Sequence, residues 1–193
     1  MESKNLVNFD FSKLQAVILP GGFAPYQWMA LTNDGLERIG QFVEKGGRCL
    51  GVCAGGYLLS REVRYDGLSY HYPTSLFDGT AEGPIPGLPI FPQVGPVRLR
   101  VTEAGRALGL EPWVSRPALF GSGPRFVRGS KVTVLLTYPD GTAAGIMRPY
   151  GKGRVIAIGA HYERPTEGDE SAPPPLGCDL GFRLLLGLKN QGP

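Results

Sequence analysis

A cysteine in the stretch GVCAGGYLLS, residues 51–60, has the surroundings of a nucleophile. Cys53 follows the apolar run RCLGV, which predicts a buried strand, and precedes small residues that predict a turn into a helix. At such a place the free amides and the positive end of the helix dipole favour the thiolate, the nucleophilic form of the side chain. Gly51 and Gly55 would allow the strained turn of a nucleophile elbow. The alternative is a buried cysteine in a glycine-rich turn, as we expect for Cys49.

The base that such a nucleophile needs is usually histidine, and the chain has two, His71 and His161. His71, in LSYHYP, has no obvious orienting partner. His161 follows the apolar run RVIAIG in GAHYERP, and Glu163 stands two residues further on. Residues i and i+2 of an extended chain project to the same side, so that the Glu163 carboxylate can fix the tautomer of the histidine ring. Cys53, His161 and Glu163 are therefore a candidate catalytic triad.

A glycine turn supplies candidate donors for the same chemistry. The apolar run LQAVIL predicts a strand buried on both faces, and it ends at Pro20-Gly21-Gly22. Open α/β sheets collect their sites at the carboxyl ends of strands, and this turn shares such a position with the cysteine and histidine of the triad. The Gly21-Gly22 turn can offer one bare amide, and Ala54 a second, to the oxyanion of a tetrahedral intermediate.

The first third of the chain alternates between strands and helices. The segment GLERIGQFVEKGG has apolar residues at helical spacing after the candidate caps Asn33 and Asp34. A further helix is expected from Cys53 to about Val63. The order strand, helix, strand, helix predicts a parallel α/β architecture.

The rest of the chain has a less regular pattern. Between Tyr65 and Arg128, prolines and the lack of a helical period predict loops and short strands around VRLRV, a long excursion of the kind that is often functional. Three further strands are expected in KVTVLLTY, AAGIM and RVIAIG, and DLGFRLLLGLKN predicts a closing amphipathic helix.

Composition limits the classes of protein to consider. The 193 residues, 42% hydrophobic and 19% charged, predict a single packed domain over residues 1–193. The net charge of +3 is mild and the basic residues are scattered, so we expect no nucleic-acid partner. Because no apolar segment approaches about 20 residues, we expect no membrane span. The first residues, MESKNLVNFDF, lack the apolar core of a signal peptide, which indicates a cytoplasmic protein.

The cysteine count bears on metals and disulfides. The three cysteines, Cys49, Cys53 and Cys178, are too few and too irregular for a disulfide framework, and they form no CxxC pair. We therefore expect no bound metal. We also expect no other cofactor, and we expect the substrate to be a small molecule.

The phrase LPGG, then GVCAGG, then a late GAHYE resembles the class I glutamine amidotransferase-like superfamily. The phrases FVEKGGRCLGVCAGGYLLS, FDGTAEGP and YGKGRVIAIGAHYE are most similar to the N-terminal domain of biotin-protein ligases and its stand-alone bacterial relatives. The resemblance implies a flavodoxin-like three-layer sandwich with a mostly parallel sheet. It also implies that Cys53 is the nucleophile, His161 the base and Glu163 its orienting acid, with the Gly22 and Ala54 amides as oxyanion hole.

The chain departs from the superfamily pattern at three points. Tyr162 stands where glutamine amidotransferases commonly have proline, and nothing resembles the catalytic half of the ligase. Only about a dozen residues precede the LPGG strand, so we expect all or part of the usual first strand-helix unit to be missing. An exposed apolar strand edge would then invite pairing with a second copy or a partner protein.

Three functions are consistent with this pattern. The first is a cysteine hydrolase or amidotransferase-like enzyme that attacks an amide or related acyl bond. The second is a binding or regulatory module in which the chemistry is idle. The third is a redox protein of the DJ-1/PfpI type. The late His-x-Glu favours the hydrolase or amidotransferase-like enzyme over this redox protein. Stable oxidation of Cys53 to a sulfinic acid would instead indicate the redox protein.

Overall fold

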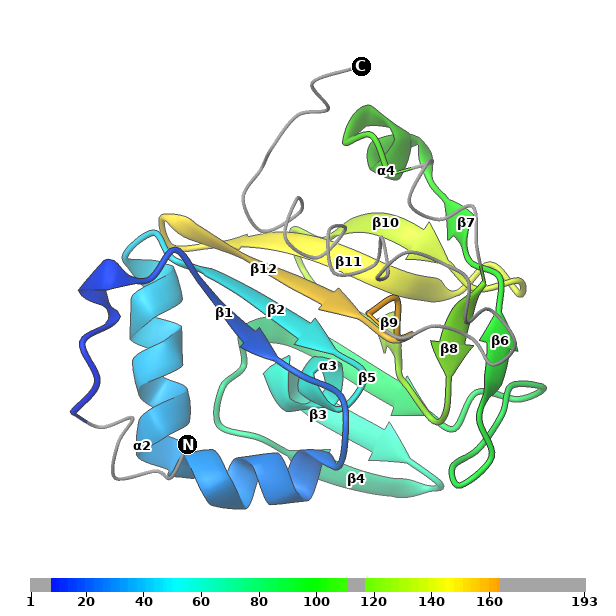
Figure 1. Cartoon of the computed structure of the whole chain (residues 1–193), viewed down its shortest axis with the longest axis horizontal. Coiled ribbons are helices and arrows are strands. Elements are labelled where there is room, and N and C mark those ends of the chain that lie inside the picture. Colours follow the sequence, from blue (N-terminus) through cyan, green and yellow to red (C-terminus); the bar gives the residue numbers. More distant parts are fainter. Residues whose placement is uncertain (1–7, 111–116, 164–193) are drawn as a thin grey trace.

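The structure is a computed structural model that describes residues 8–110 and 117–163 (Figure 1). In chain order its elements are the 3-10 turn η1 (Phe11–Lys13), β1 (Ala16–Leu19), α2 (Ala24–Glu44), β2 (Arg48–Val52), α3 (Ala54–Leu59), β3 (Ser60–Tyr65), β4 (Leu68–His71), β5 (Phe77–Gly83), β6 (Gly95–Val97), β7 (Arg100–Val101), α4 (Glu103–Ala107), β8 (Ala118–Phe120), β9 (Arg125–Val127), β10 (Thr133–Thr137), β11 (Ala143–Tyr150) and β12 (Gly153–Ile158). The predicted closing helix lies outside the described residues.

The main sheet is mixed. Its strand order is β1-β2-β12-β11-β9-β5-β3-β4, with β10 paired to β11 and β7 paired to β10. Strands β1, β2 and β12 are parallel to one another, and β3 is parallel to β5, but the other neighbours are antiparallel. The predicted parallel order is therefore right for the strands that carry the candidate site, whereas the expectation of a mostly parallel sheet is not confirmed. The reason is local, because tight connections such as those between β3 and β4 or β11 and β12 can only join antiparallel neighbours.

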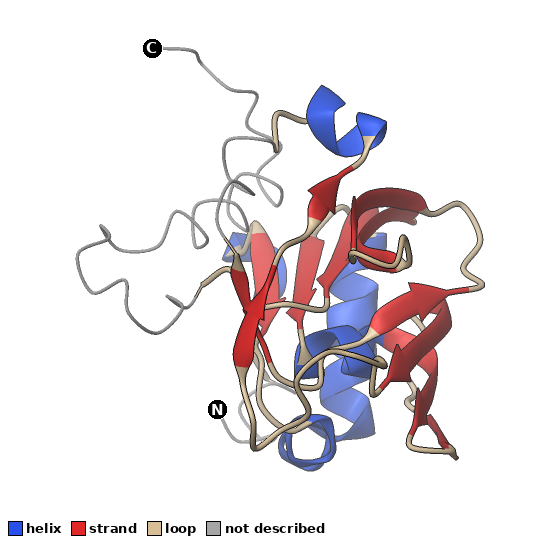
Figure 2. Cartoon of the chain, turned by 90° about the vertical axis from the view of Figure 1, so that its right-hand side faces the viewer, coloured by secondary structure: helices blue, strands red, loops and turns tan. Residues whose placement is uncertain are grey.

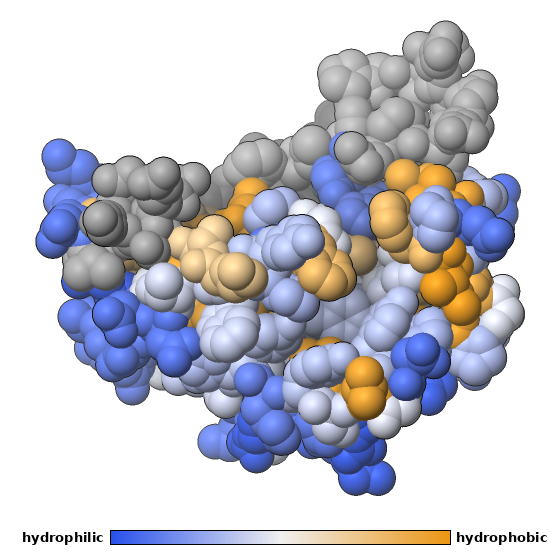
Figure 3. Space-filling view, turned by 90° about the horizontal axis from the view of Figure 1, so that it is seen from below, coloured by the Kyte–Doolittle hydropathy of each residue, from blue (hydrophilic) through white to orange (hydrophobic). Residues whose placement is uncertain are grey.

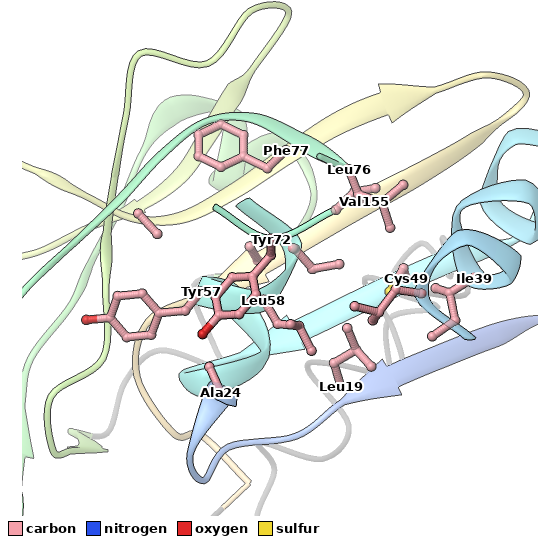
Figure 4. Close-up of a cluster of buried hydrophobic side chains, with 14 of the residues drawn as sticks. Leu19, Ala24, Ile39, Cys49, Tyr57, Leu58, Tyr72, Leu76, Phe77 and Val155 are labelled. Atoms are coloured by element: carbon pink, nitrogen blue, oxygen red, sulfur yellow. The ribbon is translucent and has the colours of Figure 1, made fainter. Parts of the chain in front are cut away.

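Two cores lie on opposite faces of the central strands. Along β12, Val155 and Ala157 join the core beneath α2 and α3, whereas Ile156 and Ile158 join the core on the other face. This is the period of two that a strand buried on both faces imposes. Figure 4 shows part of the core under the helices, where Leu19, Ile39 and Leu58 gather beside Cys49. Seen from the side, the strands of the sheet twist strongly (Figure 2).

Helix α2 is longer than the sequence predicts and is broken within. Thr32, with φ 58° and ψ 171°, interrupts the helical conformation, and the two halves meet at a corner in Figure 1. The second half is the predicted helix, and it buries Leu36, Ile39 and Val43. Full burial of one such side chain contributes roughly 1.5–3 kcal/mol. The first half, which begins just after the Pro20-Gly21-Gly22 turn, was not predicted.

Helix α3 is shorter than predicted, because it ends at Leu59 and strand β3 follows at once. Ser60, Glu62 and Arg64 lie in β3, which pairs with both β4 and β5. Sheet hydrogen bonds to strands far along the chain therefore outweigh the local helical tendency. Between Tyr65 and Arg128 the structure has the short strands that were expected, together with the short helix α4.

The helices and the surface bear on where apolar side chains are exposed. Among the described residues, no helix is long and apolar enough to cross a membrane. Figure 3 shows separate apolar patches on a largely hydrophilic face. The large exposed apolar side chains include Phe23, Tyr26 and Met29 around the first half of α2, and Ile90, Phe91 and Val94 in the loop before β6.

Candidate functional site

Cys53 stands in a tight turn between β2 and α3. Its backbone has φ 49° and ψ −105°, a conformation that residues with a side chain rarely adopt. Its amide donates to Ile158 O at 2.8 Å, and its carbonyl accepts from the Tyr57 amide at 3.2 Å. The turn thus joins the carboxyl ends of β2 and β12 and begins α3, as the sequence predicts for a nucleophile elbow. Cys53 is 5% exposed.

Glycines bring α3 against the neighbouring strands. A Cβ on Gly55 would lie 2.1 Å from Leu19 O, and one on Gly51 would lie 2.6 Å from Gly55 O. Neither separation is possible for a real side chain, so the turn in this shape requires glycine at both positions. The Gly55 amide donates to Pro20 O at 3.1 Å, which ties the elbow to the turn that follows β1.

His161 is the third residue after β12 and faces the elbow. Its backbone forms an isolated bridge with Leu119, with N–O distances of 2.8 and 3.0 Å. Its Nδ1 lies 2.5 Å from Glu163 Oε1, so the two residues meet as the i, i+2 spacing predicts. The histidine side chain is 14% exposed.

The electrostatic surroundings of His161 link it to the cysteine. Burial lowers the pKa of the ring, but hydrogen bonding to the Cys53 side chain and to the Glu163 carboxylate outweighs burial, and the pKa rises from 6.5 to about 9. The raised pKa favours the imidazolium form of the ring near neutral pH. The structure places Cys53, His161 and Glu163 together.

The turn Pro20-Gly21-Gly22 lies on the same side of the molecule. A Cβ on Gly21 would lie 2.1 Å from His161 Cε1, so only glycine lets the ring pack here. Gly22 has φ +132°, a conformation that favours glycine. Ala54 is the first residue of α3, where amides lack an acceptor within the helix. The residues that the sequence singles out for the oxyanion hole therefore flank the same histidine and cysteine.

Two side chains missed in the sequence support the site. Gln27, in the first half of α2, donates from Nε2 to Pro20 O at 2.8 Å and to Gly21 O at 3.2 Å. Tyr57, one turn of α3 after Cys53, donates to Ser122 O at 2.9 Å. The Tyr57 hydroxyl is buried, and burial first and the neighbouring Cys53 second raise its pKa far above the ordinary value. No sequence motif announces either contact, because the Gln27 bonds depend on a half-helix that the sequence does not predict and the Tyr57 bond joins residues far apart in the chain.

The other histidine and cysteine of the described chain lie elsewhere. His71 is exposed at the end of β4, where its Nδ1 approaches Arg61 O at 3.3 Å. Cys49 is fully buried in β2, and burial raises the pKa of its thiol to about 12, as expected for a packing residue. Within residues 8–110 and 117–163, no cluster of three His, Cys, Asp or Glu side chains could hold a metal ion.

Comparison with known families decides the assignment. The family described as "Biotin-protein ligase, N terminal" matches residues 10–173. The chain belongs to the biotin-protein ligase N-terminal family. Biotin–protein ligase of Schizosaccharomyces pombe is 29% identical over 171 aligned residues, which cover 79% of this chain and 26% of the ligase. The chain thus spans about a quarter of the length of this curated relative. The family match and this relative together confirm the resemblance inferred from the sequence.

Solved structures support the same fold. A crystal structure of a glutamine amidotransferase is similar with a TM-score of 0.58 and 20% identity, covering 92% of this chain and 82% of that one. A cytoplasmic protein from Salmonella typhimurium gives the same TM-score at 11% identity, with 99% and 80% covered. At these identities the likeness shows the fold alone. This biotin-protein ligase N-terminal domain thus has an α/β fold, and its structural neighbours include a glutamine amidotransferase.

Proposed function

We propose that this chain is a cysteine-dependent hydrolase or amidotransferase-like domain that acts on an amide or related acyl bond of a small molecule. Cys53 is the nucleophile, His161 the general base and acid, and Glu163 the residue that orients the ring. The observation that carries the proposal is the contact of His161 with Glu163 at the carboxyl end of a central strand, together with the rise that Cys53 and Glu163 cause in the His161 pKa. The likeness to a glutamine amidotransferase supports a flavodoxin-like layering.

In the first half of the reaction the Cys53 thiolate attacks the carbonyl carbon of the substrate. A carbon–sulfur bond forms, and the carbonyl π electrons move to the oxygen, which the amides of Gly22 and Ala54 would receive. The His161 imidazolium then gives its proton to the leaving nitrogen, and the carbon–nitrogen bond breaks. The products are an acyl-thioester on Cys53 and a free amine or ammonia.

Water completes the cycle. His161, now neutral, accepts a proton from a water molecule that attacks the thioester carbonyl, and the carbon–sulfur bond breaks to release the acid and restore the thiolate. Because Nδ1 is held by Glu163, Nε2 is the ring nitrogen left to carry this proton. The part of Glu163 is to hold the ring in place and to stabilise the imidazolium.

The pH dependence of cysteine alkylation tests the proposal. Iodoacetamide is added to the parent protein and to His161→Ala over a range of pH, and each cysteine is scored by mass spectrometry. We expect Cys53 to react at least about tenfold faster than Cys178 near pH 7, and to lose that advantage without His161. Cys49, which is fully buried, is the internal control for inert thiols. An alkylation rate at Cys53 that does not depend on His161 would contradict the proposal.

A second candidate is a binding module of the same fold with no chemistry. The near-complete burial of Cys53, at 5% exposed, favours it, because a nucleophile must be reached by its substrate. The two functions differ in one measurement. Cys53→Ser abolishes turnover in the enzyme and leaves ligand affinity unchanged in the binding module.

A further inference from the structure

Gln27 holds the turn from which the proposed oxyanion donor comes. Its Nε2 donates to two consecutive carbonyl groups, Pro20 O at 2.8 Å and Gly21 O at 3.2 Å. The Pro20 carbonyl accepts a further hydrogen bond, from the Gly55 amide of α3. One side chain of α2 and one main-chain group of α3 therefore fix the orientation of this turn.

The direction of those carbonyl groups sets the direction of the next amide. The peptide bond between Gly21 and Gly22 is trans, since the cis bonds of the described residues lie elsewhere. In a trans peptide the C=O and the N–H point to opposite sides. With the Gly21 carbonyl turned toward Gln27, the Gly22 N–H is turned away from it, and Gly22 itself is exposed. The amide is thus free to meet a ligand oxygen.

The orientation of the Gln27 amide is maintained at a cost. Its Oε1 is buried and has no hydrogen-bond partner among the described residues. A rotation that exchanged Oε1 and Nε2 would set an acceptor against two carbonyl acceptors, so the structure keeps both Nε2 bonds and leaves Oε1 unpaired. A glutamine that served only to fill space would not impose this arrangement.

We propose that Gln27 is a positioning residue that presents the Gly22 amide to the oxyanion of the acyl-transfer step. The inference rests on the proposed function, because an oxyanion forms only if Cys53 attacks a carbonyl group. Gln27 acts through the turn and does not touch the reacting atoms. Its loss should slow steps that develop an oxyanion and leave the reactivity of the thiolate unchanged.

Two probes separate these effects in the full chain. Acylation uses p-nitrophenyl acetate: the sulfur–carbon bond forms, the ester carbon–oxygen bond breaks, and p-nitrophenolate is released and measured, with Cys53→Ser as background. Alkylation of Cys53 by iodoacetamide displaces iodide and forms no oxyanion. In Gln27→Met, which keeps the length of the side chain without its donors, we expect acylation to slow about tenfold. Alkylation should stay within about twofold of the parent.

Gln41→Met is the matched control. Gln41 lies on the same helix, is exposed, and donates to Glu37 Oε1 at 3.2 Å, away from the turn. We expect it to leave both rates unchanged. Parental acylation in Gln27→Met would overturn the inference, and so would an equal fall in both rates, which would show that Gln27 supports the whole turn. If the parent itself is acylated no faster than Cys53→Ser, the proposed function fails, and the inference fails with it.

Discussion

The turn at Cys53 and the break at Thr32 are two places where a residue with a side chain holds a conformation that normally belongs to glycine. Cys53 has φ 49° and ψ −105°, and Thr32 has φ 58° and ψ 171°. Such conformations cost about 1–3 kcal/mol each and persist only where the surrounding structure imposes them. The two sites differ in what imposes them.

A main-chain hydrogen bond ties Cys53 to the sheet, whereas a side-chain hydrogen bond spans the break at Thr32. The Cys53 amide is bonded to Ile158 O, at the end of a central strand. Across the break in α2, Trp28 Nε1 donates an exposed side-chain hydrogen bond to Asn33 Oδ1 at 2.8 Å. Strain at the elbow is therefore part of the core, while strain in α2 is local. The difference teaches that strain held by the sheet at a reactive side chain, as at Cys53, is a better reason to propose a functional site than local strain at a helix break.

Breaking the packing of the elbow should have the largest effect. In Gly55→Ala the new methyl group would lie 2.1 Å from Leu19 O, and the Gly55 bond to the Pro20 carbonyl would have to shift. We expect the free energy of unfolding to fall by about 3 kcal/mol or more, measured by urea denaturation, and selective alkylation of Cys53 to be lost.

Gly40→Ala is the matched control for this change. Gly40 lies in the second half of α2, where a Cβ would be 3.9 Å from its nearest neighbour, Leu76 Cδ2. Because alanine is a better helix former, this variant should be more stable than the parent by about 0.8 kcal/mol. Equal destabilisation of the two variants would show that the close approach at the elbow does not matter.

The ion pair at the elbow predicts a pH dependence of stability. The pKa of His161 is raised from 6.5 to about 9 in the folded protein. Burial lowers this pKa, but Cys53 and Glu163 raise it by more than burial lowers it. A histidine whose pKa is raised on folding stabilises the folded state at pH values below its pKa in the unfolded chain. This stabilisation is lost as the pH rises through its pKa in the folded protein. The free energy of unfolding should therefore fall between about pH 6.5 and pH 9, by on the order of 2 kcal/mol.

Urea denaturation at a series of pH values measures this fall, and His161→Gln provides the control. The variant keeps a polar side chain at this position but does not titrate, so its stability should be nearly flat over the same range. A fall of the same size in the variant would assign the effect to other groups, and the contact between His161 and Cys53 would not be the source of the raised pKa.

The candidate triad comes from local signals, because the strand before Cys53, the small residues after it, and the spacing of His161 and Glu163 each concern a few neighbouring residues. The structure sets Cys53 in the turn before α3 and brings His161 and Glu163 into contact. The strands β1, β2 and β12 were predictable for the same reason, because each is a short apolar run that ends near glycine or proline. The expected burial of β1 on both faces is wrong, because β1 lies at the edge of the sheet and Ile18 is exposed.

The parts that were missed depend on distant pairing. Ser60 begins a strand instead of continuing a helix because β3 lies between β4 and β5, and no local pattern shows those partners. Gln27 was missed because its role lies in a hydrogen bond to a turn six and seven residues earlier, at the start of a half-helix that the sequence does not announce.

Thr32 offers the smallest effect and the sharpest test of the comparison. Thr32→Gly removes the side chain that makes this conformation unfavourable, and the added entropy of the unfolded glycine chain offsets part of the gain, so we expect about 1 kcal/mol of stabilisation in urea. In Cys53→Gly the relief of strain is offset by the loss of a buried side chain, and we expect almost no net change. Thr32→Ala, which keeps a Cβ, is the control and should gain less than Thr32→Gly. If Thr32→Gly instead lowers the stability, the break in α2 is held by its threonine, and the two strained residues are equivalent after all.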